Sequence, residues 1–392
     1  MSRTIREHRN LTDEQREMIR LARDFAAKEI RPRGAAVYEA DVESPLDLWK
    51  AASAIGLTQL MMPAEYGGGG ITDLTTQALV QQELAYGDIS IGAFLTSNGF
   101  FSGPIEALGT EDQKKHWLGM LSSDEPPITA LATTEPDVGS DAASIQTRAK
   151  REGDHYVLNG QKTWISNAPY AEYFLVFATV DPTLRSRGVT AFVVPRDSEG
   201  LHVGKPMRKL GQRGIVNAEL FLEDVRVPVE NRLGEEGQGF YGLMRTFDAS
   251  RILIGSSATG LSRAALDASI EYAQQREQFG KPIVEHQAVA FRLADMATRV
   301  DASHLLTLRA AELYDAGEVA TEEAAMAKLV ASENASYVTN AAIATYGGWG
   351  YSREFPLAQW MNDAKLEELE EGTSDIQRLI ISRSLAKSGA PK

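Results

Sequence analysis

Three stretches with different hydrophobic periods make up this chain. From Thr12 to about residue 125, apolar residues recur at helical spacing, as Met18, Leu21 and Phe25 do near the start. Between about residues 128 and 240 the period changes to two, which is typical of short strands. After Gly239 the helical period returns and holds almost to the end. The order helix, strand, helix indicates an α+β protein with a small β domain between two helical parts.

The middle stretch predicts strands separated by glycine and proline. These strands cover residues 155–158, 161–165, 173–180, 189–194 and 218–227. Asn159-Gly160 lies between the first two and is a strong hairpin signal. The pattern favours a compact antiparallel barrel or sandwich over a parallel sheet.

Helical tracts flank the β domain on both sides. Residues 79–101 are rich in small and apolar residues and predict a buried helix, and amphipathic tracts predict helices over 252–275, 287–316, 322–345 and 376–387. We therefore expect an N-terminal α-helical domain over residues 1–126, a middle antiparallel β-barrel domain over 127–239 and a C-terminal four-helix bundle over 240–392.

The composition and net charge of the chain exclude several classes of function. The 392 residues carry a formal net charge of −14 and no cysteine, and the six histidines form no metal-binding pattern. We therefore expect no metal site, no nucleic-acid partner and no membrane partner. No segment has the uninterrupted apolar length of a membrane span. The start of the chain, with Arg3, Arg6 and Arg9, lacks the apolar core of a secretory signal, so a cytoplasmic protein is expected.

The stretch from Lys365 to Asp375 is strongly acidic. Four carboxylates crowd the end of an expected helix, namely Glu367, Glu368, Glu370 and Glu371. Gly372 suits a left-handed helix end, and Ser374 with Gln377 fits a capping box for the next helix. A charged residue in such a turn is well placed for chemistry. Alone, however, the stretch favours a solvated acidic face.

Four further motifs could bind a ligand, and each also has a plain structural interpretation. Residues 133–141 could contact phosphate or a heterocycle, or form an Asx-type turn. Trp164 beside Ser166 could flank a planar cofactor, or be a core tryptophan at a polar strand end. Residues 276–287 could meet a pyrophosphate, or form a solvated interhelical turn. The glycines of 347–350 belong to another loop between helices and lack the strand-then-helix context of a dinucleotide fingerprint, so nicotinamide binding is rejected.

Together and in this order, the five motifs resemble the acyl-CoA dehydrogenase family, most closely its medium- and short-chain branch. The resemblance covers essentially the whole chain, and Thr134-Glu135-Pro136-x-x-Gly139-Ser140-Asp141 and Glu371-Gly372-Thr373 are its most specific parts. It implies bound FAD with these contacts: Leu131, Thr133, Thr134, Gly139, Ser140, Trp164, Ser166, Arg276, Gln278, Phe279, His286, Gln287, Ala344, Gly347, Gly348, Thr373 and Asp375. Arg276, Gln278, Phe279, Gly347 and Gly348 would reach the FAD of a neighbouring subunit, which implies a dimer and commonly a homotetramer built as a dimer of dimers.

The resemblance also implies the reaction. A base takes the Cα proton of an acyl-CoA thioester while flavin accepts the Cβ hydride, which yields a trans-2-enoyl-CoA. Glu371 matches the base, and Arg251 matches a nearby catalytic arginine. Contacts to the substrate fall on Ser140, Asp248, Arg251 and Gly372. Isovaleryl-type relatives carry the base at the position of Ser250, and since a serine cannot act as that base, the role falls to Glu371. Such a base needs a pKa raised by an apolar, dehydrated pocket.

Three departures from the family pattern stand near these positions. Glu370 replaces the aromatic residue usual before the base, Asn362 replaces an arginine, and Ala344 replaces a glutamine. If Glu370 faces the pocket, it and Glu371 would titrate as a coupled pair, whereas a solvent-facing Glu370 would be neutral in effect. Glu367 and Glu368 are expected to remain surface charges.

The sequence indicates the acyl chain length of the substrate and the electron acceptor less directly than it indicates the reaction. The family's acyl pocket corresponds to residues 84–101, where small residues (Gly92, Ala93, Ser97, Gly99) suggest room and Phe94, Phe100 and Phe101 could close it. This tract has no arginine, which disfavours a substrate with a terminal carboxylate. Electron-transferring flavoprotein is the implied acceptor. The alternatives are a same-fold flavin oxidase that uses O2 and a non-catalytic relative that binds acyl-CoA or flavin.

Overall fold

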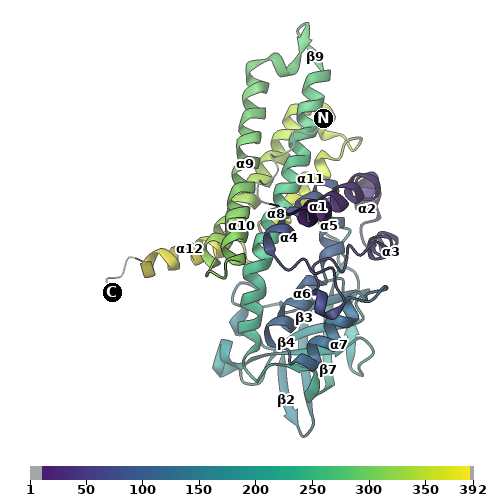
Figure 1. Ribbon diagram of the computed structural model, residues 1–392, viewed down its shortest axis with the longest axis vertical. Helices are drawn as coiled ribbons and strands as arrows, with labels where there is room; N and C mark the ends of the chain where they lie inside the picture. Colours follow the sequence, from purple (N-terminus) through teal and green to yellow (C-terminus); the bar gives the residue numbers. More distant parts are fainter. Residues whose placement is uncertain (1–10, 389–392) are drawn as a thin grey trace.

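The computed structural model describes residues 11–388, so Arg3, Arg6 and Arg9 lie outside the described residues. Two helical parts lie on one side of a β-sheet domain, with the longest helices running along the long axis of the molecule (Figure 1). This arrangement confirms the expected α+β fold class.

The N-terminal helices form a compact layer beside the long helices. They are α1 Asp13–Phe25, α2 Gly34–Ala40, α3 Leu46–Ala54, α4 Leu74–Gly87, α5 Ile89–Thr96, α6 Gly99–Leu108 and α7 Glu111–Leu121. The capping box of Thr12 and Gln15 forms at the start of α1. The buried tract over 79–101 falls in three helices instead of one. The first break is at Asp88, which ends α4 and caps α5 by accepting a hydrogen bond from the Ile91 N–H at 3.0 Å.

The middle domain is one eight-stranded sheet. Its strands are β1 Thr129–Ala132, β2 Arg148–Glu152, β3 His155–Ser166, β4 Tyr173–Thr179, β5 Val189–Pro195, β6 Leu201–Val203, β7 Asn217–Pro228 and β8 Arg232–Leu233. The order is β6-β7-β3-β2-β4-β5-β8, with β1 paired to β4. Most pairs are antiparallel as expected, but β1 and β2 each pair with β4 in parallel.

The expected hairpin at Asn159-Gly160 is wrong, because both residues lie inside the single long strand β3. The β2–β3 turn instead falls at Gly153, which has a φ of +66°. Gly160 is required for close packing: a Cβ there would lie 2.6 Å from the Thr147 hydroxyl. Asn159 bonds across to Asp224 on β7, where the ladder shifts register.

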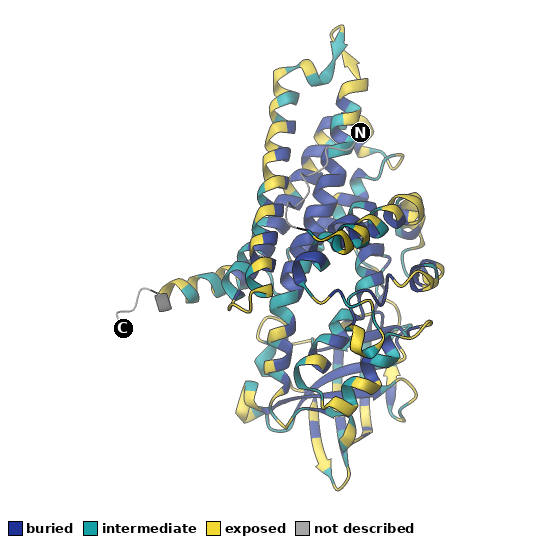
Figure 2. Cartoon of the chain, viewed as in Figure 1, coloured by how far each residue is buried: buried dark blue, intermediate teal, exposed yellow. Residues whose placement is uncertain are grey.

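The C-terminal part is a bundle around one central helix. Its helices are α8 Gly239–Gln275, α9 Gln287–Asp315, α10 Thr321–Tyr346, α11 Leu357–Glu367 and α12 Ser374–Ser388, and a small hairpin, β9 Glu277–Gln278 with β10 Lys281–Pro282, joins α8 to α9. The inner faces of α8 and α10 are buried (Figure 2), while α12 projects sideways from the bundle (Figure 1). None of the helices in the described part of the chain combines the length and apolar character that a membrane span needs.

Candidate active site

The turn between α11 and α12 places Glu371 among α8, α10 and α12 of the bundle. Glu371 has a φ of +50°, which is strained for a residue with a side chain, and Gly372 follows with +92°. The expected capping box of Ser374 and Gln377 is wrong by one residue. Thr373 precedes α12 instead, and its hydroxyl accepts a hydrogen bond from the Ile376 N–H at 3.4 Å.

The Glu371 carboxylate faces α8. Its Oε2 accepts a hydrogen bond from the Ser250 hydroxyl at 2.8 Å, and its backbone carbonyl accepts one from Arg251 Nε at 3.4 Å. Burial raises the pKa of Glu371 to about 7, although the Ser250 hydrogen bond acts in the opposite direction. A carboxylate with this proton affinity suits a general base near neutral pH.

Arg251 and Asp248 lie side by side next to this carboxylate. Arg251 Nη1 donates to Asp248 Oδ1 at 2.9 Å, and the Thr321 hydroxyl donates to the other Asp248 oxygen at 2.7 Å. Both residues come from α8, one turn apart, so the helix presents them to the same space. The structure thus brings together Glu371, Ser250, Arg251 and Asp248.

Two buried side chains hold the turn: Lys328, which sequence reasoning missed, and Gln377, which was expected in a capping box instead. Lys328 Nζ donates to the Gly372 carbonyl at 2.9 Å. Gln377 Nε2 donates to the same carbonyl at 2.7 Å and to the Glu371 carbonyl at 3.2 Å. Both side chains are fully buried. Lys328 follows Ala324 by one helical turn within an alanine-rich tract, and a lysine on such an apolar face is the signal that could have found it.

The expectation that Glu367 and Glu368 are surface charges is wrong for Glu367, which is 1% exposed. Gln212 Nε2 donates to its Oε1 at 2.5 Å, so the last turn of α11 packs on the loop before β7. Glu368 is half-buried and bonds to Ser336 and, at 2.8 Å, to Lys365. The acidic stretch is therefore not a solvated face.

The loop after β1 lies against the end of β3. The Thr163 N–H donates to the Thr134 carbonyl at 2.9 Å, and buried Lys162 donates to the Thr133 carbonyl at 3.0 Å and to Glu135 at 2.8 Å. These contacts fix the start of the loop that carries Gly139 and Ser140 against the end of β3. Leu131 precedes it in β1.

Trp164 and Ser166 end β3 in an open position. Trp164 has a φ of +61° and is 57% exposed, so its indole stands out of the sheet and is not a core tryptophan. Asn217, which sequence reasoning missed, donates from Nδ2 to the Trp164 carbonyl at 2.9 Å and to the Ser166 hydroxyl at 3.1 Å. It therefore orients both positions from the neighbouring strand.

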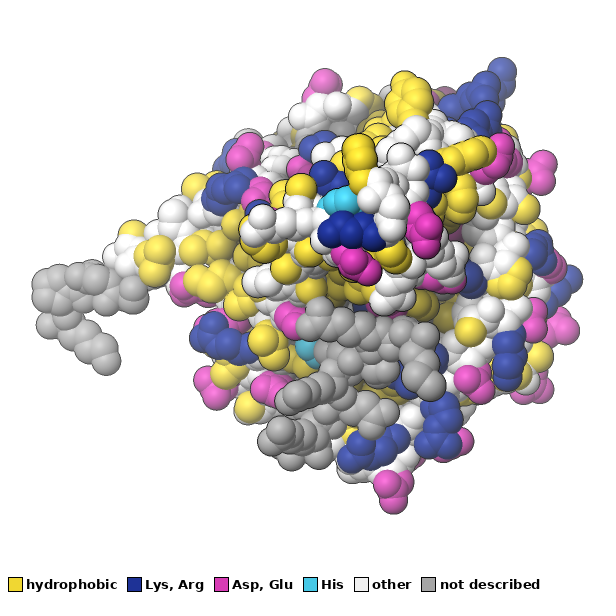
Figure 3. All heavy atoms as spheres, turned by 90° about the horizontal axis from the view of Figure 1, so that it is seen from above, with side chains coloured by type: hydrophobic (Ala, Val, Ile, Leu, Met, Phe, Trp, Pro, Cys, Tyr) yellow, Lys and Arg dark blue, Asp and Glu magenta, His cyan; other side chains and the backbone are white. Residues whose placement is uncertain are grey.

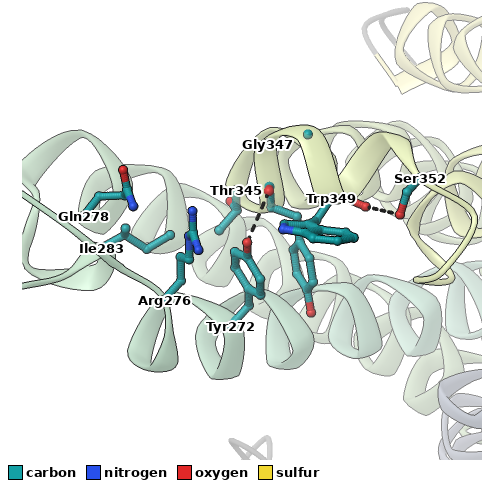
Figure 4. A pocket seen from close by; sticks show the side chains of 10 residues that line it. Tyr272, Arg276, Gln278, Ile283, Thr345, Gly347, Trp349 and Ser352 are labelled. Carbon is teal, nitrogen blue, oxygen red and sulfur yellow. Dashed lines mark hydrogen bonds between the residues drawn. The ribbon is translucent and has the colours of Figure 1, made fainter.

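A second group of the expected FAD contacts lies near the β9–β10 hairpin. Arg276, Gln278, Gly347 and Gly348 line a cavity of about 620 Å³ together with Tyr272, Ile283, Thr345, Tyr346, Trp349 and Ser352 (Figure 4). Phe279 at the hairpin tip is 95% exposed. His286 Nε2 lies 3.0 Å from the Gln278 carbonyl, Gln287 begins α9, and Ala344 is exposed near the end of α10.

The two groups of expected FAD contacts lie in different parts of the fold. The β9–β10 hairpin is at the top of Figure 1, whereas the sheet domain, to which β3 belongs, occupies the lower part. Seen from above, hydrophobic side chains lie among charged ones on the hairpin end (Figure 3), where Phe279, Phe291, Trp349 and Tyr351 are exposed.

Some residues of the segment expected to line the acyl pocket, residues 84–101, pack in the protein core instead. Phe94 is fully buried against Trp49, and Phe101 is fully buried against Trp117. A Cβ on Gly92 would lie 3.0 Å from the Leu84 backbone, so this glycine allows α4 and α5 to approach and does not widen a pocket.

Family profiles match almost the whole chain. The acyl-CoA dehydrogenase N-terminal domain matches residues 12–125, the middle domain matches 130–225, and the C-terminal domain matches 237–386. The chain belongs to the acyl-CoA dehydrogenase family.

Individual relatives agree with this assignment. The chain is 42% identical to the "Probable acyl-CoA dehydrogenase YngJ" of Bacillus subtilis, over 96% of this chain and 99% of that one. It is 41% identical to the mitochondrial short-chain specific acyl-CoA dehydrogenase of Bos taurus, over 93% and 88%. The solved butyryl-CoA dehydrogenase of Megasphaera elsdenii superposes with a TM-score of 0.92 at 37% identity, over 96% and 99%. The protein is an oxidoreductase that acts on CH–CH bonds, and its cofactor is FAD.

The residues present fit FAD. The Thr133 hydroxyl is buried without a hydrogen-bond partner in the loop expected to contact the flavin. At Gly139, Gly347 and Gly348 a Cβ would meet nothing within 4 Å, so the backbone at these positions is open to a ligand. Arg276 at the cavity supplies a guanidinium suited to a phosphate.

Proposed function

We propose that this protein removes the Cα proton and the Cβ hydride of an acyl-CoA thioester and releases a trans-2-enoyl-CoA, with Glu371 as the base. The observation that carries the proposal is the Glu371 carboxyl group. It is held in a strained turn by Ser250, and burial raises its pKa to about 7. Bound FAD supplies the hydride acceptor for this reaction.

Other groups of this chain polarise the thioester, orient the catalytic turn and contact the substrate. The Glu371 backbone N–H polarises the thioester carbonyl, which makes the Cα proton more acidic. Arg251 orients the turn through the Glu371 carbonyl and is itself oriented by Asp248, which contacts the pantetheine arm. Ser140 and Gly372 contact the substrate from the loop and from the turn. Together these contacts hold the reacting carbon atoms of the substrate in a fixed orientation next to the Glu371 carboxylate.

The site also requires a second copy of the chain. Because the β9–β10 hairpin lies at the end of the bundle away from the sheet domain (Figure 1), we propose that a complete FAD site takes the loop and β3 from one subunit and the hairpin from the next. This supports the proposal of a dimer, with a homotetramer built from two dimers. Within the cytoplasm, we propose that electron-transferring flavoprotein takes up the electrons, and the exposed indole of Trp164 faces the route by which they leave.

Anaerobic addition of acyl-CoA to the flavin-loaded enzyme tests the function. We expect the visible flavin band to bleach with at least one member of a panel of straight, branched and cyclic acyl-CoAs. Failure of every member to bleach it would reject the proposal. Rapid peroxide formation during aerobic turnover would instead assign an oxidase.

The base itself is tested by Glu371→Gln, which keeps the shape of the side chain and removes its proton affinity. We expect acyl-CoA still to bind while flavin reduction falls by about 10³-fold or more, since general-base catalysis contributes 10²–10⁴-fold. Binding is followed by the spectral shift of the flavin and reduction by stopped flow. Unchanged reduction would show that another group takes the proton.

A further inference from the structure

Asn217 is a buried amide that joins the end of β3 to a lysine in the loop before β7. It begins β7, pairs with Ser166 in the register of the sheet and is 7% exposed. Its Nδ2 donates to the Trp164 carbonyl at 2.9 Å and to the Ser166 hydroxyl oxygen at 3.1 Å. Its Oδ1 accepts a hydrogen bond from Lys209 Nζ at 2.6 Å. Both N–H groups of the amide and its oxygen therefore have partners.

Two of these partners allow only one orientation of the Asn217 amide. A backbone carbonyl such as that of Trp164 can only accept a hydrogen bond, and an ammonium such as that of Lys209 can only donate one. With the amide turned over, its oxygen would face the Trp164 carbonyl and its N–H groups would face the ammonium. Lys209 and the Trp164 carbonyl therefore hold Nδ2 on the side of Ser166.

Lys209 is held in this place by the loop to which it belongs. Its Nζ also donates to the Ile215 carbonyl at 2.6 Å, so the side chain bridges residues 209–215. The loop is fixed from outside as well, because the Gln212 N–H donates to Asp363 Oδ1 of α11 at 2.5 Å. Burial lowers the pKa of Lys209 to about 8, while nearby carboxyl groups act against burial. The side chain is thus mainly an ammonium at pH 7.

The hydroxyl of Ser166 keeps one hydrogen for a ligand. Its oxygen accepts from Asn217, so its own O–H cannot point back at the amide. Ser166 is exposed, and its side chain donates no hydrogen bond to any group in the part of the chain that the structure describes. The hydrogen is therefore free on the open side of the sheet, where the indole of Trp164 also stands.

We propose that Asn217, oriented by Lys209, is a positioning residue that makes the Ser166 hydroxyl a hydrogen-bond donor to the flavin ring. Lys209 donates to Asn217, Asn217 donates to Ser166, and Ser166 donates to the cofactor. All three bonds of this relay run in one direction, and such a series strengthens its last donor. Only Ser166 contacts the cofactor, and the other two residues act through it. The inference rests on the proposed contact of Ser166 with FAD.

Replacing the amide of Asn217 by a carboxylate tests this inference. In Asn217→Asp an oxygen replaces Nδ2, so the Ser166 hydroxyl should turn inward and donate to the new carboxylate, although the serine is still present. The readout is the NMR spectrum of holoenzyme loaded with FAD that carries ¹⁵N and ¹³C in the flavin ring, because the resonance of a ring acceptor depends on the hydrogen bond that it receives. Ser166→Ala identifies the ring atom that loses its donor. We expect Asn217→Asp to move the same resonance in the same direction, and to weaken FAD binding at pH 7 by about fivefold, the usual effect of one hydrogen bond.

Lys209→Met removes the ammonium and keeps most of the apolar stem. Because the Trp164 carbonyl still holds Nδ2, we expect a smaller shift of the same resonance in the same direction. Lys205→Met is the matched control, because Lys205 is an exposed lysine of the same loop and its loss should leave the resonance in place.

The Ser166→Ala background separates the relay from direct effects of charge. In that background, neither Asn217→Asp nor Lys209→Met should move the resonance further, since an effect that runs through the hydroxyl is lost with it. A shift that persists without the hydroxyl would assign the effect to charge or packing and overturn the inference.

Two further results would contradict the relay. If Ser166→Ala moves no flavin resonance, Ser166 donates nothing to the cofactor. If the resonance stays in place in Asn217→Asp, the amide does not orient the hydroxyl, and the same result in Lys209→Met would remove the lysine from the relay. Should one of these two variants fail to fold, the other decides. The spectra need no turnover, so an enzyme whose flavin no acyl-CoA reduces would reject the proposed function while the relay is still judged.

Discussion

Ser250 acts on the proton affinity of Glu371 through a single hydrogen bond. The hydroxyl donates to Glu371 Oε2 at 2.8 Å and so stabilises the ionised carboxylate against the effect of burial. A base that is too strongly protonated would be inactive at neutral pH, and one that is fully ionised would be weak. Ser250 therefore helps to keep the base near the middle of this range.

Ser250→Ala should raise the pKa of Glu371 and move the acidic limb of the rate profile to higher pH. The expected shift is about one pH unit, since a hydrogen bond to a charged group is worth about 1.5 kcal/mol. Flavin reduction by acyl-CoA, followed by stopped flow from pH 5.5 to 9 (about the range in which a carboxyl with this pKa titrates), measures it. Ser269→Ala is the control, because Ser269 lies on the same helix and bonds only within it, to the Ala265 carbonyl. A limb that stays in place would contradict the role of Ser250.

At this scale the sequence predicted the residues that resemble family motifs and missed those that support them. Glu371, Arg251 and Asp248 were predicted, and the structure brings them together. Lys328 and Gln212 were missed, because each lies far along the chain from the turn that it supports. Local patterning cannot report a contact between α10 or the β6–β7 loop and the end of α11; only the packing of the bundle creates it.

At the scale of elements, the turn between α11 and α12 is the part that aims the base. The Gly372 and Glu371 carbonyls are fixed by side chains of α10, α12 and α8, so the turn is set by three helices and not by its own sequence alone. Its strained backbone persists because these contacts over-determine it. A change of backbone here should therefore affect catalysis as well as stability.

Gly372→Ala should lower both stability and turnover. The residue has a φ of +92°, and a Cβ would lie 2.9 Å from Gln377 Nε2 and 3.0 Å from Ile376. We expect a loss of about 1–3 kcal/mol in unfolding free energy and a fall in kcat, because the turn must move to admit the methyl group. Urea unfolding and steady-state turnover measure the two effects.

Gly317→Ala is the matched control for this substitution. Gly317 also has a positive φ, of +75°, but a Cβ there would meet nothing within 4 Å. It should lose stability through backbone strain alone and retain kcat. An equal loss of kcat in both variants would mean that the turn does not aim the base.

At the scale of elements, the wrong hairpin prediction in the middle domain shows why a strand pattern can mislead. Asn159-Gly160 is a hairpin signal, yet a Cβ on Gly160 would lie 2.6 Å from the Thr147 hydroxyl, so only glycine fits at this position of the strand. The positions of the long helices followed directly from their periodicity, apart from α8, which begins 13 residues earlier than the expected start at 252 since its first residue is Gly239. The helical period can be read from residues that are close in sequence. The reason for a glycine inside a strand depends instead on the residue that packs against it in the folded sheet.

At the scale of the whole molecule, the two groups of expected FAD contacts lie in different parts of the fold, one at the sheet domain and one at the hairpin end of the bundle. Trp164 and Ser166 end a strand of the sheet, and Arg276 and Phe279 lie at the far end of α8. Periodicity predicted each of these elements, but it gave no information about their distance in space. That distance makes assembly part of the chemistry, because each site would need residues of two subunits.

Mixed dimers test this shared site. Arg276→Ala should weaken FAD binding in the neighbouring site, and Glu371→Gln should remove the base from its own site, so each homodimer should be weakly active. In a mixed dimer, the Glu371 of the Arg276→Ala subunit meets the intact Arg276 of its partner, which restores one site of two. Random mixing of equal amounts should therefore recover about a quarter of wild-type turnover. Activity that only averages the two homodimers would place a complete FAD site within one chain, and FAD content of the mixture, measured by absorbance, would show whether the cofactor follows the same rule.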